Sequence, residues 1–585
     1  MKKILFSVLM AGMVVQMLAQ SLPVGLPVVE DYLRRQQLLG DSTYPASLMI
    51  RPSYGYNDYS IGSNSEGYVG FGSSRTGNAD NQSVPAQINS RGNASGAFVL
   101  RAMPLVWKQQ YISDHPIMGL NDGAMIPARG YQTLVSGGFF ARLGILSLQL
   151  MPEFVYAQNL PFDGLPHELN NKVWSVYNSV KNVIDLPDRF GEEPYRKVFW
   201  GQSSLRLTYK SLSLGVSNEN LWWGPGTKNT LLMTNNAPGF KHITLNTVKP
   251  IVTPIGKFEG QIVGGRLDNS GFPGVDSVSL AQHGIRPRQK RDEWRYINAM
   301  TVTYEPRWIP GLTLGGVRSF TIYNGSITDN YRTYLPLLEP LLKISVGAPE
   351  SDTIPSDQIA SVFARWVMPE SHSEVYLEYG RADHSWDMTD FILEPGHYRA
   401  YVLGLRKLVP LVRRKNEYID IHLEITELGR NLISSLRKAN NPAVWYIHGQ
   451  VRHGYTHNGQ ILGSGIGTSS NMQSLNISWV KDYKRIGFEL HRLAHDEDLW
   501  AYMTQNTGYG DYRTHWTDVG GAFVADWNFR NLLVNFKFQT IGSINYKYFY
   551  DPIPSDPPFW WDRGPVRYNM HAALSLVYLL STKKH

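Results

Sequence analysis

The sequence predicts an all-β protein, an antiparallel transmembrane β-barrel of about 18 strands that follows a short N-terminal periplasmic helix. Segments of about eight to twelve residues with alternating apolar and polar side chains recur from about residue 95 onward. Short turns alternate with long loops, and aromatic residues make up 12% of the chain. Outer-membrane barrels combine these features because one face of each strand meets lipid and the other meets a polar lumen.

The N-terminus predicts a secretory signal peptide over residues 1–19. Met1-Lys2-Lys3 is a positive start, Ile4 to Val15 is an apolar run, and cleavage is expected after Ala19. The alternative is an N-terminal membrane anchor, but the run is short for a spanning helix. The rest of the sequence contains no apolar run of about 18 residues, so no helical span is expected.

Composition narrows the classes of function. The chain has no cysteine, which excludes disulfides, thiolate metal sites and a lipid-modified cysteine. The net charge of +7 falls to about +5 without Lys2 and Lys3 (7 − 2), which is mild for this length and does not indicate nucleic acid as a partner. The 33 tyrosines and 16 tryptophans suit aromatic girdles at two membrane interfaces.

Residues 20–94 form a separate N-terminal segment. Val28 to Leu39 predicts a short helix, because Val28, Tyr32 and Leu39 recur at helical spacing, and Gly40 is a natural stop. Residues 41–94 are rich in Gly, Ser, Asn and Tyr and predict an irregular periplasmic segment.

Residues 95–585 predict the barrel with long external loops. In Tyr418 to Thr426, isoleucine and leucine alternate with Asp420, His422 and Glu424, which indicates lipid on one face and a polar lumen on the other. Ser204 to Tyr209 and Asn569 to Leu580 repeat the pattern. A half-buried strand of a soluble sheet would show a similar alternation.

Eight short turns set the topology. Each predicts a periplasmic hairpin, and eight hairpins with one strand before them and one after give about 18 strands. Trp445 to Tyr455 also resembles a strand. A spanning strand there would place the short turn at residues 482–485 on the external side of the membrane. We therefore assign residues 428–473 to one long external or lumenal loop. The turns lie near residues 142–144, 210–211, 253–256, 306–311, 369–373, 409–416, 482–485 and 530–531.

Three groups of residues are candidates for polysaccharide binding. Flat aromatic faces pack on sugar C–H surfaces, and neighbouring polar groups bind hydroxyls. The alternatives are a membrane-interface girdle and a plug inside the barrel. The candidates are Glu219, Trp222, Trp223, Asn235 and Asn236; Tyr455, His457 and Asn458; and Trp560, Trp561, Asp562 and Arg563.

The sequence contains no signal that predicts an enzyme, a metal site or a cofactor. It has no Gly-x-Ser-x-Gly elbow and no phosphate-binding loop of the Gly-rich Lys-Ser or Lys-Thr type. The spacing of His448, His453 and His457 matches no familiar zinc pattern. Asp496-Glu497-Asp498 is better explained as a solvated acidic loop than as a calcium site.

Nine short stretches follow one another in order along the mature chain. They are Tyr32 to Arg35, Leu38 to Gly40, Ile50 to Pro52, Met151 to Phe154, Trp222 to Gly226, Thr234 to Pro238, Glu378 to Gly380, Glu394 to Arg406 and Gly454 to Gly467. Together they resemble the capsule assembly protein Wzi family of outer-membrane barrels. The resemblance implies an 18-stranded barrel with helical material on the periplasmic side and a lectin-like, non-catalytic role at the bacterial cell outer membrane. Gln460 stands where the family pattern has a basic residue, and the helical N-terminal part is short.

The leading hypothesis is therefore an outer-membrane protein that binds capsular or another surface polysaccharide through external loops. Outer-membrane lipid and the capsule-export machinery are further expected partners. A porin or uptake channel is the alternative, because the lumenal face carries Asp420, His422 and Glu424. A hydrolase acting at the external rim is a third hypothesis, for which no motif stands in the sequence.

Overall fold

The computed structural model describes most of the chain from residue 98 onward and parts of the N-terminal segment. The predicted signal peptide, much of residues 41–94 and the stretch from Trp560 to Arg563 lie outside the described residues and stay predictions. In the described part, no helix is both long and apolar enough to cross a membrane. The described residues are 22–40, 46–53, 61–63, 69–71, 98–328, 334, 356–382, 392–393, 396, 398–429, 445–509, 512–551 and 565–580.

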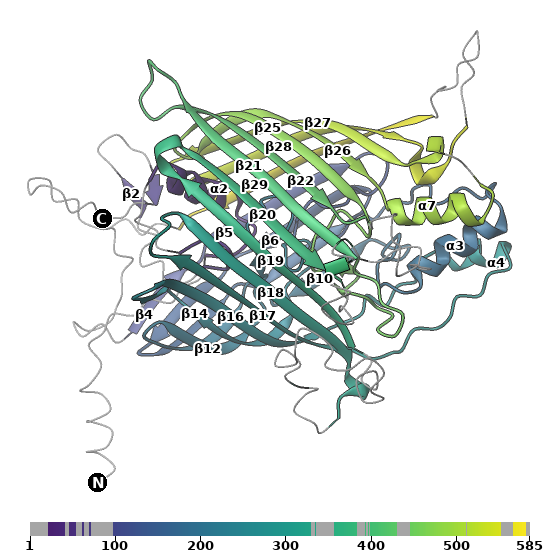
Figure 1. Ribbon diagram of the computed structural model, residues 1–585, viewed down its shortest axis with the longest axis horizontal. Coiled ribbons are helices and arrows are strands. Elements are labelled where there is room, and N and C mark those ends of the chain that lie inside the picture. The colour runs from purple at the N-terminus through teal and green to yellow at the C-terminus, as the bar shows by residue number, and fades with distance from the viewer. Residues whose placement is uncertain are drawn as a thin grey trace, which may run out of the picture.

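One antiparallel sheet of 23 described strands closes into a barrel (Figure 1). The final strand pairs with the first long one, with Tyr578 opposite Leu105 and His571 opposite Ile112, so the sheet meets itself. Closure satisfies backbone hydrogen-bonding groups that lipid cannot. The strands before residue 270 are β4 (Phe98–Ala102), β5 (Leu105–Ile112), β6 (Gly130–Ser136), β7 (Phe139–Leu143), β8 (Leu146–Leu150), β9 (Glu153–Ala157), β10 (Tyr195–Phe199), β11 (Ser204–Tyr209), β12 (Leu212–Ser217), β14 (Lys241–Thr247), β15 (Ile251–Thr253) and β16 (Gly256–Leu267).

The later strands are longer and uninterrupted, and each pairs with its neighbour in the sequence order of the barrel. They are β17 (Arg295–Pro306), β18 (Leu312–Tyr323), β19 (Ser356–Met368), β20 (Ser373–Arg381), β21 (Arg399–Pro410), β22 (Tyr418–Glu427), β25 (Asn471–Lys481), β26 (Lys484–Ala494), β27 (Thr517–Phe529), β28 (Leu532–Ile544) and β29 (Val566–Tyr578).

Several early strands are two collinear pieces. Two sets of four pieces each pair side by side. The set farther from the short turns is β5, β6, β9 and β10, and the set nearer to them is β4, β7, β8 and β11. At one interruption, a Cβ on Gly138 would lie 1.7 Å from the carbonyl oxygen of Leu150, so only glycine fits there. The predicted number of strands is reached only when the five pairs β4/β5, β6/β7, β8/β9, β10/β11 and β14/β15 are each counted once (23 − 5 = 18).

All eight predicted short turns join consecutive strands at one end of the barrel, which we call the inner end. Five of them are two-residue hairpins, and in three of these Lys210, Asp482 and Arg530 have positive φ angles of 54°, 49° and 49°. Hairpins this short favour such angles because the turn must match the twist of the strands. The long loops lie at the other end, the outer end.

Strand faces alternate as the sequence predicts. In β22, Ile421 and Leu423 face outward and are 38% and 39% exposed, while Asp420 and Glu424 are buried inside. Strand β11 repeats this pattern, with Leu205 and Leu207 exposed and the lumenal side chains between them buried. The exposed apolar face suits lipid, and the polar face needs partners inside the lumen.

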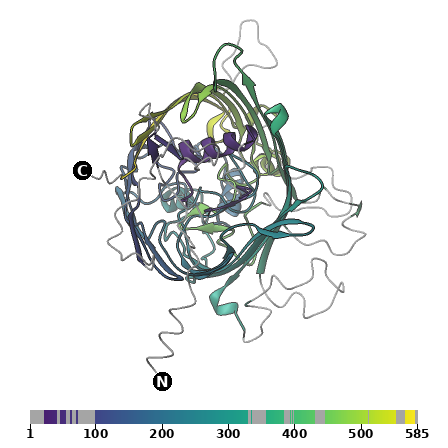
Figure 2. The same cartoon turned by 90° about the vertical axis from the view of Figure 1, so that its left-hand side faces the viewer.

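Helix α2 (Pro27–Leu38) lies inside the barrel near the inner end (Figure 2). Proline at the first helical position fits because its missing N–H would be unpaired there in any case. The helix ends before Gly40, whose φ of 78° stops it. The sequence predicts a periplasmic helix of this length; the structure places it within the lumen, where Leu38 packs on Leu408 and Val480.

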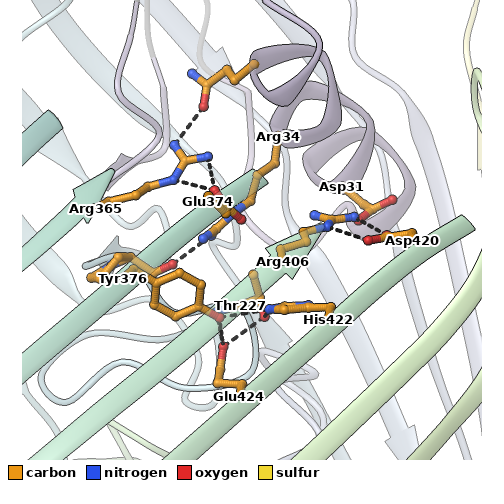
Figure 3. A network of polar contacts seen from close by, with 12 residues as sticks. Asp31, Arg34, Thr227, Arg365, Glu374, Tyr376, Arg406, Asp420, His422 and Glu424 are labelled. Atoms are coloured by element: carbon orange, nitrogen blue, oxygen red, sulfur yellow. Dashed lines mark hydrogen bonds and ion pairs between the residues drawn. The ribbon is translucent and has the colours of Figure 1, made fainter. Parts of the chain in front are cut away.

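Buried ion pairs hold α2 to the wall (Figure 3). The Nε atom of Arg34 donates to Glu374 at 2.7 Å, and Glu374 also accepts from Nε of Arg365 at 2.7 Å. On the same helix, Asp31 accepts from Nη2 of Arg406 at 2.5 Å, and Arg406 also binds Asp420 at 2.6 Å. The helix therefore forms ion pairs with the wall through one cation, Arg34, and one anion, Asp31.

Three further helices form an outer cap at the outer end (Figure 1). They are α3 (Asn171–Lys181), α4 (Ser277–Gln282) and α7 (Glu497–Asn506). The side chain of Asn170 caps α3 by accepting from the backbone N–H of Val173. A second apolar core, separate from that of the lumen, joins these helices through Leu165, Leu169, Val173, Trp174, Tyr177, Val180, Val275, Leu280, Leu499, Met503 and Tyr548.

Two long loops fold back into the lumen and, with α2, make up the lumenal plug. The plug consists of α2, residues 218–240 and residues 445–470. Residues 445–470 do not span the membrane, as predicted, and Trp445 and Tyr455 are almost fully buried. Three two-stranded pieces complete the described fold: β1 (Ile50–Arg51) with β13 (Trp222–Trp223), β2 (Ile61–Ser63) with β3 (Val69–Phe71), and β23 (Thr456–His457) with β24 (Gln460–Ile461).

We predict that Glu374→Gln releases α2 from the wall. Two buried guanidinium groups, those of Arg34 and Arg365, would lose their counter-charge, which costs about 3–5 kcal/mol for a broken buried pair. The measurement is limited trypsin digestion of the folded barrel, with faster cleavage after Arg34 and Arg35 expected. Glu305→Gln is the matched control, because Glu305 pairs with the half-exposed Lys257 at the inner end. Equal cleavage rates in both variants would contradict the clamp.

Candidate functional site

The tryptophan pair lies inside the plug, away from both the lipid and the outer surface. Trp222 and Trp223 are 3% and 0% exposed, and the indole N–H of Trp223 donates to Gln261 at 3.0 Å. The guanidinium of Arg51 lies 4.5 Å from the centre of the Trp222 ring. The pair forms β13 and hydrogen-bonds to β1, so it ties the N-terminal segment to the wall.

The loop that follows the tryptophans wraps a wall carboxylate (Figure 3). Backbone N–H groups of Thr227, Lys228 and Asn229 donate to Glu424 at 2.7, 3.0 and 2.8 Å. The hydroxyl of Tyr376 donates to the same carboxylate at 2.6 Å. Successive N–H groups of this kind form a concave anion site. Here the anion belongs to the barrel itself, so the loop is a structural anchor.

The neighbouring candidates are also committed to internal bonds. Glu219 is fully buried and accepts from Arg206 at 2.6 Å. The side-chain amide of Asn235 accepts from Asn220 at 2.7 Å and donates to the carbonyl of Asn121 at 2.8 Å. The amide of Asn236 donates to the carbonyl of Ile461 at 2.9 Å. Buried polar groups satisfied in this way are not free to bind a surface ligand.

The second group of candidates lies in the plug loop of residues 445–470, where Tyr455 and His457 are 1% and 3% exposed. The hydroxyl of Tyr455 donates to Ser319 at 3.1 Å, and the backbone N–H of Asp268 donates to His457 Nδ1 at 3.0 Å. Burial lowers the pKa of His457 to about 3, so its ring is neutral at physiological pH. Asn458 is partly exposed and accepts from Lys197 at 2.8 Å.

A pocket of about 100 Å³ opens between the outer cap and the plug. At its side, the carboxylate of Asp188 binds the ammonium groups of Lys181 at 2.8 Å and Lys547 at 3.2 Å and the hydroxyl of Tyr177 at 2.9 Å. Burial alone would raise the pKa of Asp188, but the two ammonium groups lower it to about 2. Two ammonium groups against one carboxylate give the cluster a formal charge of +1 (2 − 1).

Aromatic rings surround this cluster. Trp516 is partly exposed, stacks on His495 at 3.7 Å and meets the rings of Tyr546 and Tyr548 edge-on at 5.1 and 5.9 Å. The ammonium of Lys547 lies 5.7 Å from the Trp516 ring. An aromatic wall beside fixed charges is the composition expected of a saccharide pocket. The Tyr546-Lys547-Tyr548 alternation was its signal in the sequence, and our sequence reasoning missed it.

Next to the pocket lies a basic strip formed by Arg286, Arg288, Lys290 and Arg291. The three arginines are exposed. Lys290 Nζ donates to the carbonyls of Lys181 and Ile184, which line the pocket, and so joins the strip to it. Burial and the neighbouring cations lower the pKa of Lys290 to about 8, while Asp185 opposes that shift. This charge run was visible in the sequence but was not singled out.

The acidic run Asp496-Glu497-Asp498 stands at the start of α7. Among the described residues, no group of three or more His, Asp or Glu side chains is placed to hold a metal ion. Asp496 directly precedes the first residue of α7 and accepts from Thr468 at 2.7 Å. Asp498 lies in the first turn of the helix and is 1% exposed, so the prediction of a solvated acidic loop is wrong. Burial and the nearby Asp498 raise the pKa of Asp496 to about 7, against the opposing effect of the hydrogen bond from Thr468.

Comparison with known proteins decides the family. The model of the capsule assembly protein Wzi family matches residues 196–529, more than half of the 585 residues. The chain belongs to this family. Its closed antiparallel barrel with an apolar outer face is that of an outer-membrane protein. No curated protein sequence matches the chain.

Three solved structures illustrate what the chain is similar to. Wzi of Escherichia coli, described as an outer-membrane protein involved in group 1 capsule assembly and as a carbohydrate-binding β-barrel, is 12% identical, with 82% of this chain and 85% of that chain covered and a TM-score of 0.49. OccK7 of Pseudomonas aeruginosa is 9% identical (82% and 98% covered, TM-score 0.37). OccAB3 of Acinetobacter baumannii is 10% identical (82% and 98% covered, TM-score 0.37).

We predict that Asp496→Asn stabilises the outer cap at high pH only. A carboxyl whose folded pKa is raised favours the folded state at low pH and loses that contribution as pH rises toward the folded pKa. At pH 8 the variant should therefore gain up to about 4 kcal/mol, the value of about three pKa units, and at pH 4 little or nothing. Thermal unfolding in detergent at both pH values checks this. An equal gain at pH 4 would contradict the assignment.

Proposed function

We propose that the protein holds an acidic surface polysaccharide at the outer face of the membrane, without catalysis, as part of capsule assembly. The observation that carries the proposal is the basic strip, whose exposed arginines stand on the outer cap beside an aromatic pocket. The family membership supports a role in capsule assembly. Outer-membrane lipid around the apolar belt and the capsule-export machinery are the further partners we propose.

The charge arrangement favours a repeating polyanion. Each exposed arginine contributes little to binding by itself, because water and salt screen its charge. A polymer that repeats its carboxylates brings many such contacts together, and the effective concentration of the later contacts is high. Arginine suits this task because its planar fork matches a carboxylate in two hydrogen bonds.

The buried candidates support this surface from below. These candidates are packed inside the plug, and in our proposal they support the outer end of the barrel instead of contacting polymer. They are Trp222, Trp223, Glu219, Asn235 and Asn236. Trp560, Trp561, Asp562 and Arg563 lie outside the described residues and stay candidates for direct contact. The pocket residue Trp516 is the aromatic side chain we propose as a stacking platform for one sugar ring.

Charge reversal of the basic strip is expected to release the polymer. We predict that Arg286→Glu, Arg288→Glu and Arg291→Glu together lower surface retention of acidic polysaccharide roughly tenfold or more, because three attractive contacts become repulsive. The measurement is the ratio of cell-bound to released polysaccharide, in cells that carry equal levels of folded protein. Trp516→Ala should weaken retention in the same assay.

The matched control is at the opposite end of the barrel. Arg413, Arg414 and Lys415 are exposed in the turn between β21 and β22, so changing all three to Glu alters the net charge equally at the inner end. We expect this variant to retain polysaccharide normally. Loss of retention in both triple variants would mean that net charge alone matters, and retention in both would remove the basic strip from the site.

The porin alternative is tested by conductance. The plug fills the lumen with α2 and two folded loops, and buried charges at Glu374 and Glu424 hold it in place. We predict no steady open conductance of the purified barrel in planar bilayers. Glu374→Gln, which weakens the plug, should produce intermittent openings. A stable open conductance of the unmodified protein would favour a channel.

A further inference from the structure

A cavity of about 290 Å³ lies inside the barrel, between the plug and the wall formed by β5, β26, β28 and β29. We call it the lumenal chamber. Its volume is close to the lower end of the range for small-molecule pockets, about 300–1,000 Å³. It is distinct from the outer pocket, because the two share only Met118 in their linings.

Three ammonium groups meet in the chamber. Lys228 from the plug and Lys537 from the wall share the carboxylate of Glu489, at 2.5 and 3.5 Å. Lys108 also lines the chamber, and within the described residues it makes no ion pair inside 4 Å. Burial raises the pKa of the nearby Asp122 to about 6, against the opposing effect of Lys108, so Asp122 is mainly ionised at neutral pH. Three ammonium groups against the carboxylates of Glu489 and Asp122 leave one net positive charge (3 − 2).

The other charged groups in the lining are committed elsewhere. Glu30 accepts from the backbone N–H of Gly25 and pairs with an arginine outside the chamber. Asp518 accepts from His495 at 2.8 Å and from the Trp516 indole at 3.0 Å. Arg485 binds Asp526 at 2.7 Å. The unmatched charge in the chamber is therefore positive and belongs to the three lysines.

A row of neutral hydrogen-bonding groups crosses the wall of the chamber. The amide of Gln539 is 3.1 Å from His491 Nε2, and His571 Nε2 is 3.2 Å from the amide oxygen of Gln110. The Nδ1 atom of His491 and the hydroxyl of Ser575 are buried in the lining, and neither has a hydrogen-bond partner among the described residues. Both residues are at least nine-tenths buried. Buried polar groups without partners are rare and indicate a missing water or ligand.

We propose that the lumenal chamber binds a small hydroxylated anion of monosaccharide size, a sugar acid with one carboxylate. The ammonium groups of Lys108, Lys228 and Lys537 provide charge-assisted hydrogen bonds to the carboxylate. The side chains of Gln110, Gln539 and the two histidines can donate to or accept from hydroxyl groups on the ring. This site is independent of polymer binding at the outer cap.

The test is equilibrium binding to the purified full chain in detergent, by isothermal titration with three probes. We expect D-glucuronate to bind saturably, D-glucose at least tenfold more weakly, and inorganic phosphate more weakly than D-glucuronate. Binding of phosphate at equal strength would overturn the hydroxyl part of the proposal. Absence of saturable D-glucuronate binding would overturn the proposal and would mean that the chamber holds only water.

Variants locate the binding. Lys537→Met should weaken D-glucuronate at least tenfold, and Lys537→Arg, which keeps the charge, should restore most of the affinity. Lys484→Met is the control, because Lys484 lies over the Trp527 ring at the inner end and outside the chamber lining. The triple glutamate variant of the basic strip should bind D-glucuronate normally. If it loses binding and Lys537→Met does not, the anion binds at the outer cap and the chamber proposal fails.

Discussion

The structure depends on carboxylates of the barrel wall that bind the plug. Glu374 binds two arginines, one from α2 and one from the wall, and Glu424 accepts three backbone N–H groups from the loop after the tryptophans. The acid group of Glu378 also contacts the plug, accepting one backbone N–H from Leu231. A buried charge is tolerable only when it is paired, so each acid dictates that a cation or an N–H cluster lies opposite it. The polar inner face of the sheet therefore selects the plug that fills it.

This constraint divides the molecule into regions with different tasks. The inner end is held by α2, which bridges Glu374 through Arg34 and Asp420 through Asp31 and Arg406. The outer cap has its own apolar core, so its surface can carry exposed arginines and a partly exposed tryptophan without disturbing the lumen. Between them lies the chamber, where two polar wall groups have no hydrogen-bond partner in the part of the chain that the structure describes.

The site could be predicted only in part. The aromatic motif around Trp223 was conspicuous in the sequence, but aromatic residues beside polar ones look the same whether they line a surface or fill a lumen. Trp223 is fully buried because the loop that follows it is hydrogen-bonded to Glu424 inside the lumen. The basic strip had the opposite problem: a charge run usually marks an ordinary solvated surface, and its contact with the pocket through Lys290 exists only in three dimensions.

The sequence by itself determined the alternating strand faces, the eight short turns and α2 with its stop at Gly40. These features are local, since strand period, turn chemistry and helix capping act over a few residues. Only the tertiary structure decided which long loops fold into the lumen and where α2 lies. Those choices rest on pairs such as Arg34 with Glu374 and Asp31 with Arg406, separated by 340 and 375 residues. No local pattern encodes such partners, because each charge finds its counter-charge only after the barrel has closed.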